Sequence, residues 1–413
     1  MSARIVAAAL ALAALAPAAH AQVESIAEVR VHGNHTTPDE DVLAVSGLAT
    51  GHPADEASLR AAERALRDSG RFEHVEVRRR YRSIADPSQI LVILLVDERP
   101  GVTGDDLTPG PITRLRAATM WLPILNHEDG YGTTYGARAA FADVLGPDSR
   151  VAVPLTWGGE RRAALELERT FDDSAFVLRS TLSETRRVNP HFEIPDRRSE
   201  ARVDASHAVL PWLRAGAGAH VAQVRLGDAY DARHAAIGPT LTLDTRIDPS
   251  FPRNAVYASV GWERVSFGTG HAGRWRTDLR GYVGLAGSTV LALRAQLDRA
   301  DAPLPMAEQP LLGGSDTLRG YHAGHQAGDS LATVSAEIRQ PLNSPLSAGQ
   351  FGVKAFVDTG TTWMSGERLR KQQFDHGIGG GVYFGVAAFT LDVDVAWPES
   401  GGPRAHVGMG VSF

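Results

Sequence analysis

Apolar and polar residues alternate in short segments from about residue 113 to the end of the chain. The last segment, 404–413, has apolar side chains at every second position: Ala405, Val407, Met409, Val411 and Phe413. A period of two is that of a β-strand, in which successive side chains point to opposite faces. The pattern therefore predicts a mainly β structure over some three hundred residues.

About sixteen such segments can be placed, and their length of roughly ten residues suits strands that cross a membrane. They lie near residues 113–122, 133–143, 149–157, 161–170, 175–185, 197–208, 212–224, 235–244, 255–265, 273–284, 288–298, 331–340, 350–359, 376–384, 387–397 and 404–413. We therefore predict a transmembrane antiparallel β-barrel of about sixteen strands over 113–413, with apolar side chains toward lipid and polar ones toward the lumen. Fourteen strands would return the chain to the same side, and a soluble β-sandwich is the alternative fold.

The first residues have the pattern of an export signal. Arg4 is followed by an apolar run over 5–15 and by Ala19-His20-Ala21, a typical cleavage site. The run is too short to cross a bilayer as a helix. We expect a signal peptide over 1–21 and a chain exported from the cytoplasm.

Residues 22–100 follow a different pattern, which predicts a small β-α-α-β-β domain. Thr37 is expected to cap the first helix, with Pro38 in its first turn. A second helix is expected over 55–69, and its buried stripe would consist of Leu59, Ala62 and Leu66. Strands are expected over 26–31, 72–81 and 90–96.

Three runs in this domain, VRVHGN (29–34), LRAAERALRDSGRFEHVEV (59–77) and ILVILLVDE (90–98), resemble a POTRA domain. POTRA domains are the periplasmic modules that precede the barrel in the BamA/TamA-type family of outer-membrane assembly factors. The resemblance implies a periplasmic POTRA domain over 22–100, a linker over 101–112 and a barrel in the bacterial outer membrane.

The longest connection between strands, 299–330, contains Leu318, Arg319, Gly320 and Tyr321. This run is similar to the family's signature on a loop that folds back into the lumen. Gly320 would allow a tight turn, and Tyr321 would offer a stacking surface.

A second run, Phe356 to Gly360, is similar to the family's F-x-D-x-G strand. Phe356, Asp358 and Gly360 share one face of that strand, which we expect to be the lumen face. The planar guanidinium of Arg319 suits bidentate pairing with Asp358. The resemblance implies that this pair holds the loop inside the barrel; a solvated arginine on a surface loop is the alternative.

Three further features have structural and functional interpretations. Residues 243–253 resemble the family's turn between strands, where Asp244 and Arg246 would hold a tight connection. The glycines over 377–385 would either weaken the seam of the barrel or provide curvature and room for the loop. Phe413 resembles the C-terminal signal by which outer-membrane barrels are recognised for insertion.

Composition limits the chemistry. The chain has no cysteine and a net charge of −6, so thiolate sites are excluded and nucleic acid is not an expected partner. The pairs His32/His35 and His322/His325 lack the third ligand of a metal site. No catalytic motif is found, so we expect neither an enzyme nor a cofactor.

The resemblance implies a factor that receives unfolded polypeptides through its POTRA domain, by pairing with a strand edge, and helps them insert into the outer membrane. Its expected partners are unfolded outer-membrane or secreted polypeptides, outer-membrane lipid and a periplasmic accessory protein. The alternatives are a two-partner-type translocator, which would export a secreted polypeptide through the barrel, and a passive porin.

Overall fold

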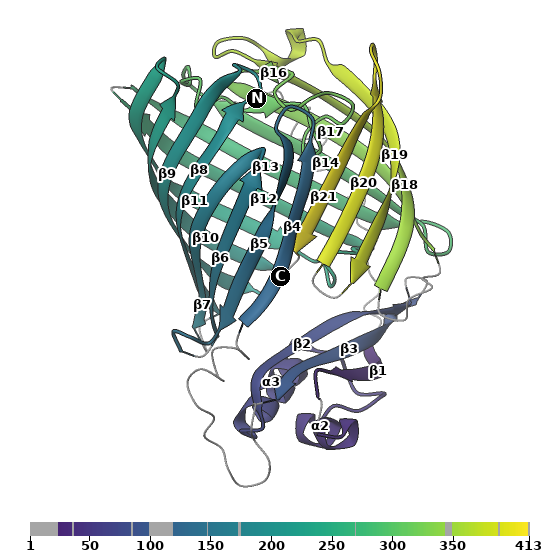
Figure 1. Ribbon diagram of the computed structural model, residues 1–413. Coiled ribbons are helices and arrows are strands. Elements are labelled where there is room, and N and C mark those ends of the chain that lie inside the picture. Colours follow the sequence, from purple (N-terminus) through teal and green to yellow (C-terminus); the bar gives the residue numbers. More distant parts are fainter. Residues whose placement is uncertain are drawn as a thin grey trace. The chain divides into compact units, whose positions relative to one another are not determined.

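The computed structural model describes residues 24–34, 37–83, 86–98, 119–146, 148–171, 175–268, 270–342, 349–386 and 389–411. These residues form two compact units, a small N-terminal one and a large barrel (Figure 1). The expected signal peptide over 1–21, the linker over 101–112 and Phe413 lie outside the described residues.

The N-terminal unit is a three-stranded sheet with two helices. Its elements are β1 (Ser25–His32), α2 (Asp39–Ser46), α3 (Glu56–Asp68), β2 (Phe72–Ser83) and β3 (Asp86–Glu98). The strand order is β1-β3-β2, with β1 parallel and β2 antiparallel to β3. The predicted β-α-α-β-β order is confirmed.

The core of this unit lies between the sheet and its helices. Ile90, Val92 and Leu94 on the central strand are fully buried. They pack in one cluster with Leu59, Ala62 and Leu66, the predicted stripe of α3. The Asp55 side chain accepts a hydrogen bond from the backbone N–H of Ser58 (2.7 Å) and so caps this helix.

The predicted cap of the first helix is wrong. Pro38 occupies the N-cap position of α2, and no side chain caps the helix. The N–H of Thr37 instead donates to Glu98 Oε1 (2.5 Å), which ties the connection before α2 to the end of β3. Three acidic residues in the first turn, Asp39, Glu40 and Asp41, lie where the helix dipole favours negative charge.

Sixteen strands close into the antiparallel barrel, which confirms the predicted fold class and strand number. They are β4 (Thr119–Glu128), β5 (Gly132–Ala142), β6 (Ser149–Gly158), β7 (Glu160–Phe171), β8 (Phe176–Asn189), β9 (Ile194–Leu210), β10 (Leu213–Leu226), β11 (Tyr230–Asp244), β12 (Ala255–Phe267), β13 (Gly270–Gly284), β14 (Val290–Ala300), β17 (Ser330–Leu342), β18 (Gly349–Trp363), β19 (Asp375–Val386), β20 (Phe389–Pro398) and β21 (Arg404–Val411). Among the described residues, no helix is long and apolar enough to cross a bilayer.

The first barrel strand was expected over 113–122, of which 113–118 lie outside the described residues; β4 (Thr119–Glu128) continues six residues beyond the predicted end. The strand includes Pro123, and a proline ordinarily argues against a strand because it lacks an N–H for the ladder. It is tolerated on an edge whose N–H groups have no partner. One side of β4 is such an edge over much of its length, as described below.

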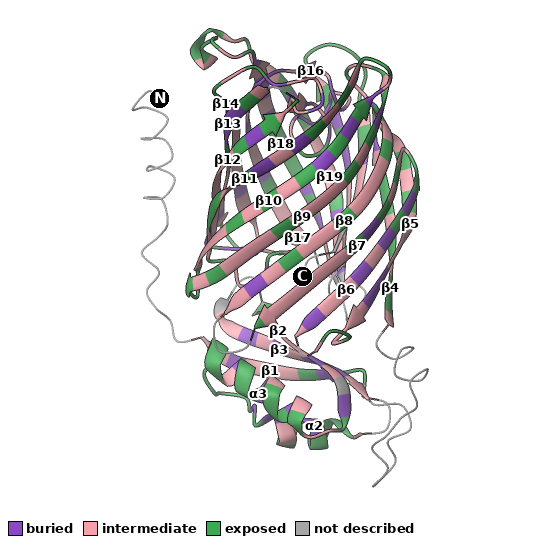
Figure 2. Ribbon diagram, turned by 90° about the vertical axis from the view of Figure 1, so that its left-hand side faces the viewer, coloured by how far each residue is buried: buried purple, intermediate pink, exposed green. Residues whose placement is uncertain are grey.

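Alternation of exposure along the strands matches the sequence pattern (Figure 2). On β18, Val353 and Val357 are 40% and 49% exposed on the outer face, whereas Asp358 is 2% exposed. Lys354 and Phe356 share the lumen face with Asp358 and are also buried. The apolar outer face and the polar lumen face are those of a membrane barrel.

Leu66→Ala should destabilise the N-terminal unit by about 2–5 kcal/mol, because it removes a fully buried side chain and leaves a cavity. Urea unfolding followed by circular dichroism at 222 nm reports on this unit, since both described α-helices lie in it. The exposed Arg64→Ala on the same helix is the control. An equal shift of the urea midpoint in both variants would contradict the expectation.

Candidate functional site: the inner loop and the barrel seam

The connection between β14 and β17, residues 301–329, is the centre of the candidate site, and we refer to it as the inner loop. Its two arms pair as β15 (Leu311–Leu312) and β16 (Gln326–Ala327). We call the end of the barrel that carries this loop the loop end and the opposite end the turn end. The tip of the inner loop reaches lumen-facing residues of β17, β18 and β20.

Arg319 binds Asp358 through three hydrogen bonds, of which one is from its backbone N–H to Oδ2 (3.2 Å). Its Nε and Nη2 donate to the two carboxylate oxygens of Asp358 at 2.7 and 2.9 Å. Its Nη1 donates to Glu337 Oε2 (2.7 Å) and Asp394 Oδ2 (3.2 Å), on two other strands. Arg319 is 7% exposed, so its charge is desolvated and depends on these three carboxylates.

Lys354 completes this group, which we call the charge cluster: Arg319, Glu337, Lys354, Asp358 and Asp394. Its Nζ lies 3.0 Å from Asp394 Oδ1 and 2.6 Å from Asp392 Oδ1. Two cations thus lie among three carboxylates, each carboxylate on a different strand. The cluster links three wall strands to the inner loop.

The neighbours of Arg319 fit the loop against the wall. Leu318 is fully buried and packs with Leu312 and Leu331. Gly320 has φ +95°, and a Cβ there would lie 3.0 Å from the backbone of Trp397 and Pro398. Only glycine combines that conformation with so close an approach.

Aromatic groups cover both sides of the same turn. The guanidinium carbon of Arg319 lies 3.2 Å from the ring centroid of Phe356, a cation–π contact. The Tyr321 ring lies 4.4 Å from that of His325, and its hydroxyl donates to the carbonyl of His376 (3.2 Å). The loop is therefore held by stacking as well as by charge.

The glycines of β19 provide space for these contacts. A Cβ on Gly377 would collide with the carbonyl oxygen of Arg319, and one on Gly379 would lie 2.5 Å from the Phe356 ring. A Cβ on Gly381 would collide with the carboxylate of Asp394. On β19 the geometry favours room for the inner loop over a weakened seam. At Gly360 on β18, a Cβ would lie 2.7 Å from Leu312.

A second anchor holds the first arm of the inner loop. Glu308 lies 2.6 Å from His234 Nδ1 and 3.2 Å from Arg274 Nη1. Arg198 Nη2 donates to the carbonyl of Ala307 (2.7 Å). Burial would raise the pKa of Glu308, but the hydrogen bond with His234 and the charge of Arg274 outweigh it and lower the pKa to about 2.

The barrel closes between its first and last strands, β4 and β21, and we call this junction the seam. Within the described residues, its register joins Val407 to His127 alone. The neighbouring pair β20 and β21 is in register from Phe389–Val411 to Ala396–Arg404. The seam is therefore paired near the loop end and open toward the turn end.

Polar contacts at the loop end of the seam involve the inner loop. Glu128 on β4 accepts hydrogen bonds from the N–H and hydroxyl of Ser315 at 2.9 and 2.6 Å. His406 Nδ1 on β21 lies 3.0 Å from Glu128 Oε1, and its Nε2 accepts from the N–H of Gly320 (3.3 Å). This arrangement requires a neutral His406 with its proton on Nδ1. Both seam strands and the inner loop are thus linked.

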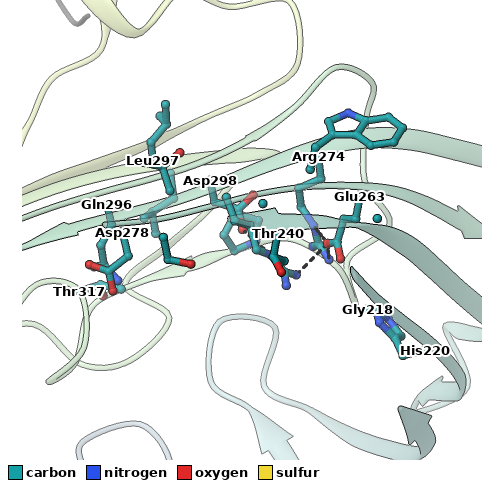
Figure 3. Close-up of a pocket in the computed structure, with 18 of the residues that line it drawn as sticks. Gly218, His220, Thr240, Glu263, Arg274, Asp278, Gln296, Leu297, Asp298 and Thr317 are labelled. Carbon is teal, nitrogen blue, oxygen red and sulfur yellow. Dashed lines mark hydrogen bonds and ion pairs between the residues drawn. The ribbon is translucent and has the colours of Figure 1, made fainter. Parts of the chain in front are cut away.

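Two cavities flank the inner loop. One, of about 400 Å³, lies between the loop and the wall of β10–β14, where Glu263, Arg274, Asp278 and Asp298 line it (Figure 3). The other, of about 460 Å³, includes the charge cluster and extends to Asn126 on β4 and His406 on β21. The second cavity therefore connects the cluster to the seam.

At the turn end, the predicted tight connection after β11 has the expected ion pair. Arg246 Nε and Nη2 donate to the two oxygens of Asp244 at 2.9 and 2.8 Å. Arg253 adds a contact that the sequence did not reveal, since its guanidinium donates to the carbonyls of Leu285, Gly287 and Thr289 in the next turn.

The described residues contain no group of three or more acidic, histidine or cysteine side chains that could hold a metal ion. His325 Nε2 lies 2.9 Å from Asp375 Oδ2, and His322 Nδ1 lies 2.9 Å from the carbonyl of Ala323. Of the other predicted pair, His35 lies outside the described residues.

Comparison with protein families matches residues 160–413 to the Omp85 superfamily domain. The chain belongs to the Omp85 superfamily. Residues 24–99 match the surface antigen variable number repeat, a POTRA domain. No curated protein matches the chain. An Omp85 barrel preceded by a POTRA domain indicates a protein of the bacterial outer membrane.

Solved structures share this Omp85 fold. BamA from Haemophilus ducreyi lacking POTRA domains 1–3 superposes with a TM-score of 0.60 at 14% identity, covering 93% of this chain and 84% of that one. CdiB from Acinetobacter baumannii gives 0.55 at 14% identity, over 95% and 74% of the two chains. CdiB from Escherichia coli gives 0.52 at 11% identity, over 94% and 90%.

Sequence analysis of this Omp85 protein placed Arg319 and Asp358 together but missed the rest of the cluster. Glu337 alternates with apolar residues on β17, and the register sets it opposite Phe356. Asp394 alternates with apolar residues on β20 in the same way. The signal that could have found both is their lumen-face position, but strand alignment is needed to show that they meet.

Arg319→Ala should release the tip of the inner loop, because it leaves three buried carboxylates with less compensating charge, a loss of about 3–5 kcal/mol. Hydrogen exchange of segment 311–323 in the purified Omp85 protein measures it. Arg370→Ala, at an exposed arginine between β18 and β19, is the control. Unchanged exchange in Arg319→Ala would refute the role of the cluster in holding the loop.

Acid should loosen the first arm of the inner loop through Glu308. Because its pKa falls from an ordinary 4.5 to about 2 in the folded protein, its stabilisation is complete above pH 4.5 and is lost as pH falls toward 2. The change corresponds to about 3 kcal/mol. Hydrogen exchange of segment 301–310, corrected for intrinsic rates, should show this loss in the wild type and not in Glu308→Gln. Identical pH profiles would count against it.

Proposed function

We propose that this Omp85 protein helps unfolded polypeptides insert into the outer membrane, with its POTRA domain in the periplasm receiving them first. The observation that carries the proposal is the seam, which is in register only at Val407 and His127 among the described residues. The loop end of the barrel then faces the cell exterior, and the turn end faces the periplasm.

An open seam suits this task for an energetic reason. Backbone N–H and C=O groups cost several kcal/mol each when left unpaired in lipid. A strand of a client barrel must satisfy these groups as it enters the bilayer. Over 121–126, β4 has no register partner on β21 among the described residues, so a client hairpin could pair there before it meets lipid.

The POTRA domain supplies a first binding surface of the same chemistry. Its sheet order leaves β2 as an edge, since β3 pairs on both sides, and β1 as an edge beyond Ile26, where the bonds to segment 51–54 end. An extended client could add to either edge through backbone hydrogen bonds, which give affinity with little sequence preference. This matches the requirement of a factor that serves several unfolded clients.

The position of the inner loop favours a path for the client polypeptide along the seam and not through the lumen. It fills the space between the two cavities, and its buried charge cluster would have to separate before a polypeptide passed through. Breaking such a cluster leaves uncompensated charge, at a cost of roughly 3–5 kcal/mol. The cavity that reaches Asn126 and His406 places the cluster next to the seam instead.

The alternative is a two-partner-type transporter that exports one secreted polypeptide through the barrel. The observation in its favour is the fold shared with two CdiB structures, at TM-scores of 0.55 and 0.52. It requires the inner loop to leave the lumen during export. The two functions therefore predict different consequences of fixing the loop in place.

The deciding experiment times the folding of a urea-unfolded outer-membrane barrel into liposomes that contain the purified protein. We expect acceleration by the full mature chain, and a loss of most of it without residues 22–100 or in Arg319→Ala. Arg370→Ala should behave as the wild type. Conductance of the same liposomes is recorded in parallel.

Absence of acceleration, together with conductance that rises in Arg319→Ala, would favour the transporter. Acceleration that does not depend on 22–100 would remove the proposed role of the POTRA domain while retaining that of the seam. A passive porin would show conductance without effect on client folding in any variant.

A further inference from the structure

Four arginines lie side by side on the outer face of the barrel near its loop end. They are Arg161 on β7, Arg186 on β8, Arg197 on β9 and Arg225 on β10, and we call them the arginine row. The strand register sets Arg161 opposite Arg186, Arg186 opposite Arg197, and Arg197 opposite Arg225. Adjacent strands lie about 4.8 Å apart, so the row spans roughly 15 Å.

The arginine row faces outward. The side chains of Arg186 and Arg225 are 58% and 57% exposed, and Arg161 and Arg197 are also exposed. Each is separated by an even number of positions from an outward-facing residue on its strand, so both lie on the same face. On β8, for example, Arg186 follows Leu182, which is 56% exposed, by four positions. The arginines are therefore on the lipid side of the wall and not in the lumen.

The depth of the row corresponds to the edge of the apolar belt. Four residues nearer the turn end, about 13 Å along the strands, the register aligns an apolar row: Leu165, Leu182, Ala201 and Val221. Trp157 on β6 is 51% exposed, and the register Thr156–Arg162 places it opposite Arg161. Outward tryptophans at strand ends mark the membrane interface.

The positive charge of the row is only partly compensated. Arg225 pairs with Asp231 (2.6 Å), and Arg186 lies 3.4 Å from Glu184. Arg161 and Arg197 have no ion-pair partner within the described part of the chain. The acidic neighbours in sequence, Glu160 and Asp196, pair with Arg187 instead, at 3.1 and 3.4 Å. Like charges directly opposite on adjacent strands are destabilising, so an external anion bound to the row would stabilise it.

We propose that the arginine row binds the phosphate groups of a phosphorylated glycolipid of the lipid A type in the outer leaflet. The planar fork of arginine matches the oxygens of a phosphate, and several neighbouring forks suit a headgroup with more than one phosphate. The apolar row below would contact its acyl chains. The inference rests on the proposed orientation, in which the loop end faces the exterior.

This combination of features favours a lipid over a soluble anion. A soluble phosphate would gain only the charge interactions, which water weakens at an exposed surface. A lipid adds burial of apolar surface on the same strands and is held by the bilayer at this depth.

The test titrates bisphosphorylated lipid A into the full mature chain in detergent micelles, with calorimetric detection. In Arg161→Gln/Arg186→Gln/Arg197→Gln/Arg225→Gln, we expect affinity to fall roughly 1,000-fold, given about 1 kcal/mol for each of the four basic residues near an anionic surface. The control, Arg60→Gln/Arg64→Gln/Arg71→Gln/Arg82→Gln, removes equal charge from exposed POTRA arginines and should bind as the wild type. A fourfold Arg→Lys variant of the row should retain intermediate affinity, and heat-modifiable migration in gels checks folding.

Equal affinity of the row variant and the wild type would overturn the proposal. So would equal, row-dependent binding of phosphatidylglycerol, which would assign the row to ordinary anionic lipid, or full competition by millimolar inorganic phosphate, which would assign it to a soluble ion. Client folding is measured separately in liposomes without lipid A. Failure of that assay with intact lipid A binding would therefore count against the proposed insertion function and not against the arginine row.

Discussion

Burial of the Arg319 charge inside the barrel is the constraint on which the candidate site depends. A desolvated guanidinium is stable only with carboxylates in good geometry, and three strands each contribute one. The requirement fixes the lumen face of β17, β18 and β20. It also explains the glycines of β19, because a side chain at Gly377 would collide with the backbone of Arg319.

The same turn of the inner loop connects the charge cluster to the seam. Arg319 binds the wall, and the next residue, Gly320, donates to His406 on the last strand. Ser315, on the other side, binds Glu128 on the first strand. The position of the inner loop and the closure of the seam at its loop end therefore depend on the same hydrogen bonds. A movement of the loop tip would remove bonds from both.

The sequence predicted most of the fold because strand alternation and lipid exposure have the same period. The prediction failed where a tertiary contact overrode the local preference of a residue for strand or helix positions. The first strand was predicted to end at 122, whereas β4 continues through Pro123 to Glu128, since an edge tolerates a residue that a paired strand excludes. Thr37 was expected as a helix cap, but its N–H pairs with Glu98, sixty-one positions away in the chain. Glu337, Asp394, Glu128 and His406 were beyond prediction because only the register between strands shows which lumen side chains meet.

The contact between Glu128 and His406 joins residues 278 positions apart. Contacts of such separation form late in folding, because the entropy of closing so long a chain segment is lost before they contribute. The inner loop can bind β17, β18 and β20 through Arg319 before this contact forms. It follows that the loop tip can be in place inside the lumen before the first and last strands meet, so that it offers Ser315 and Gly320 as a ready-made template on which the two strands close the barrel.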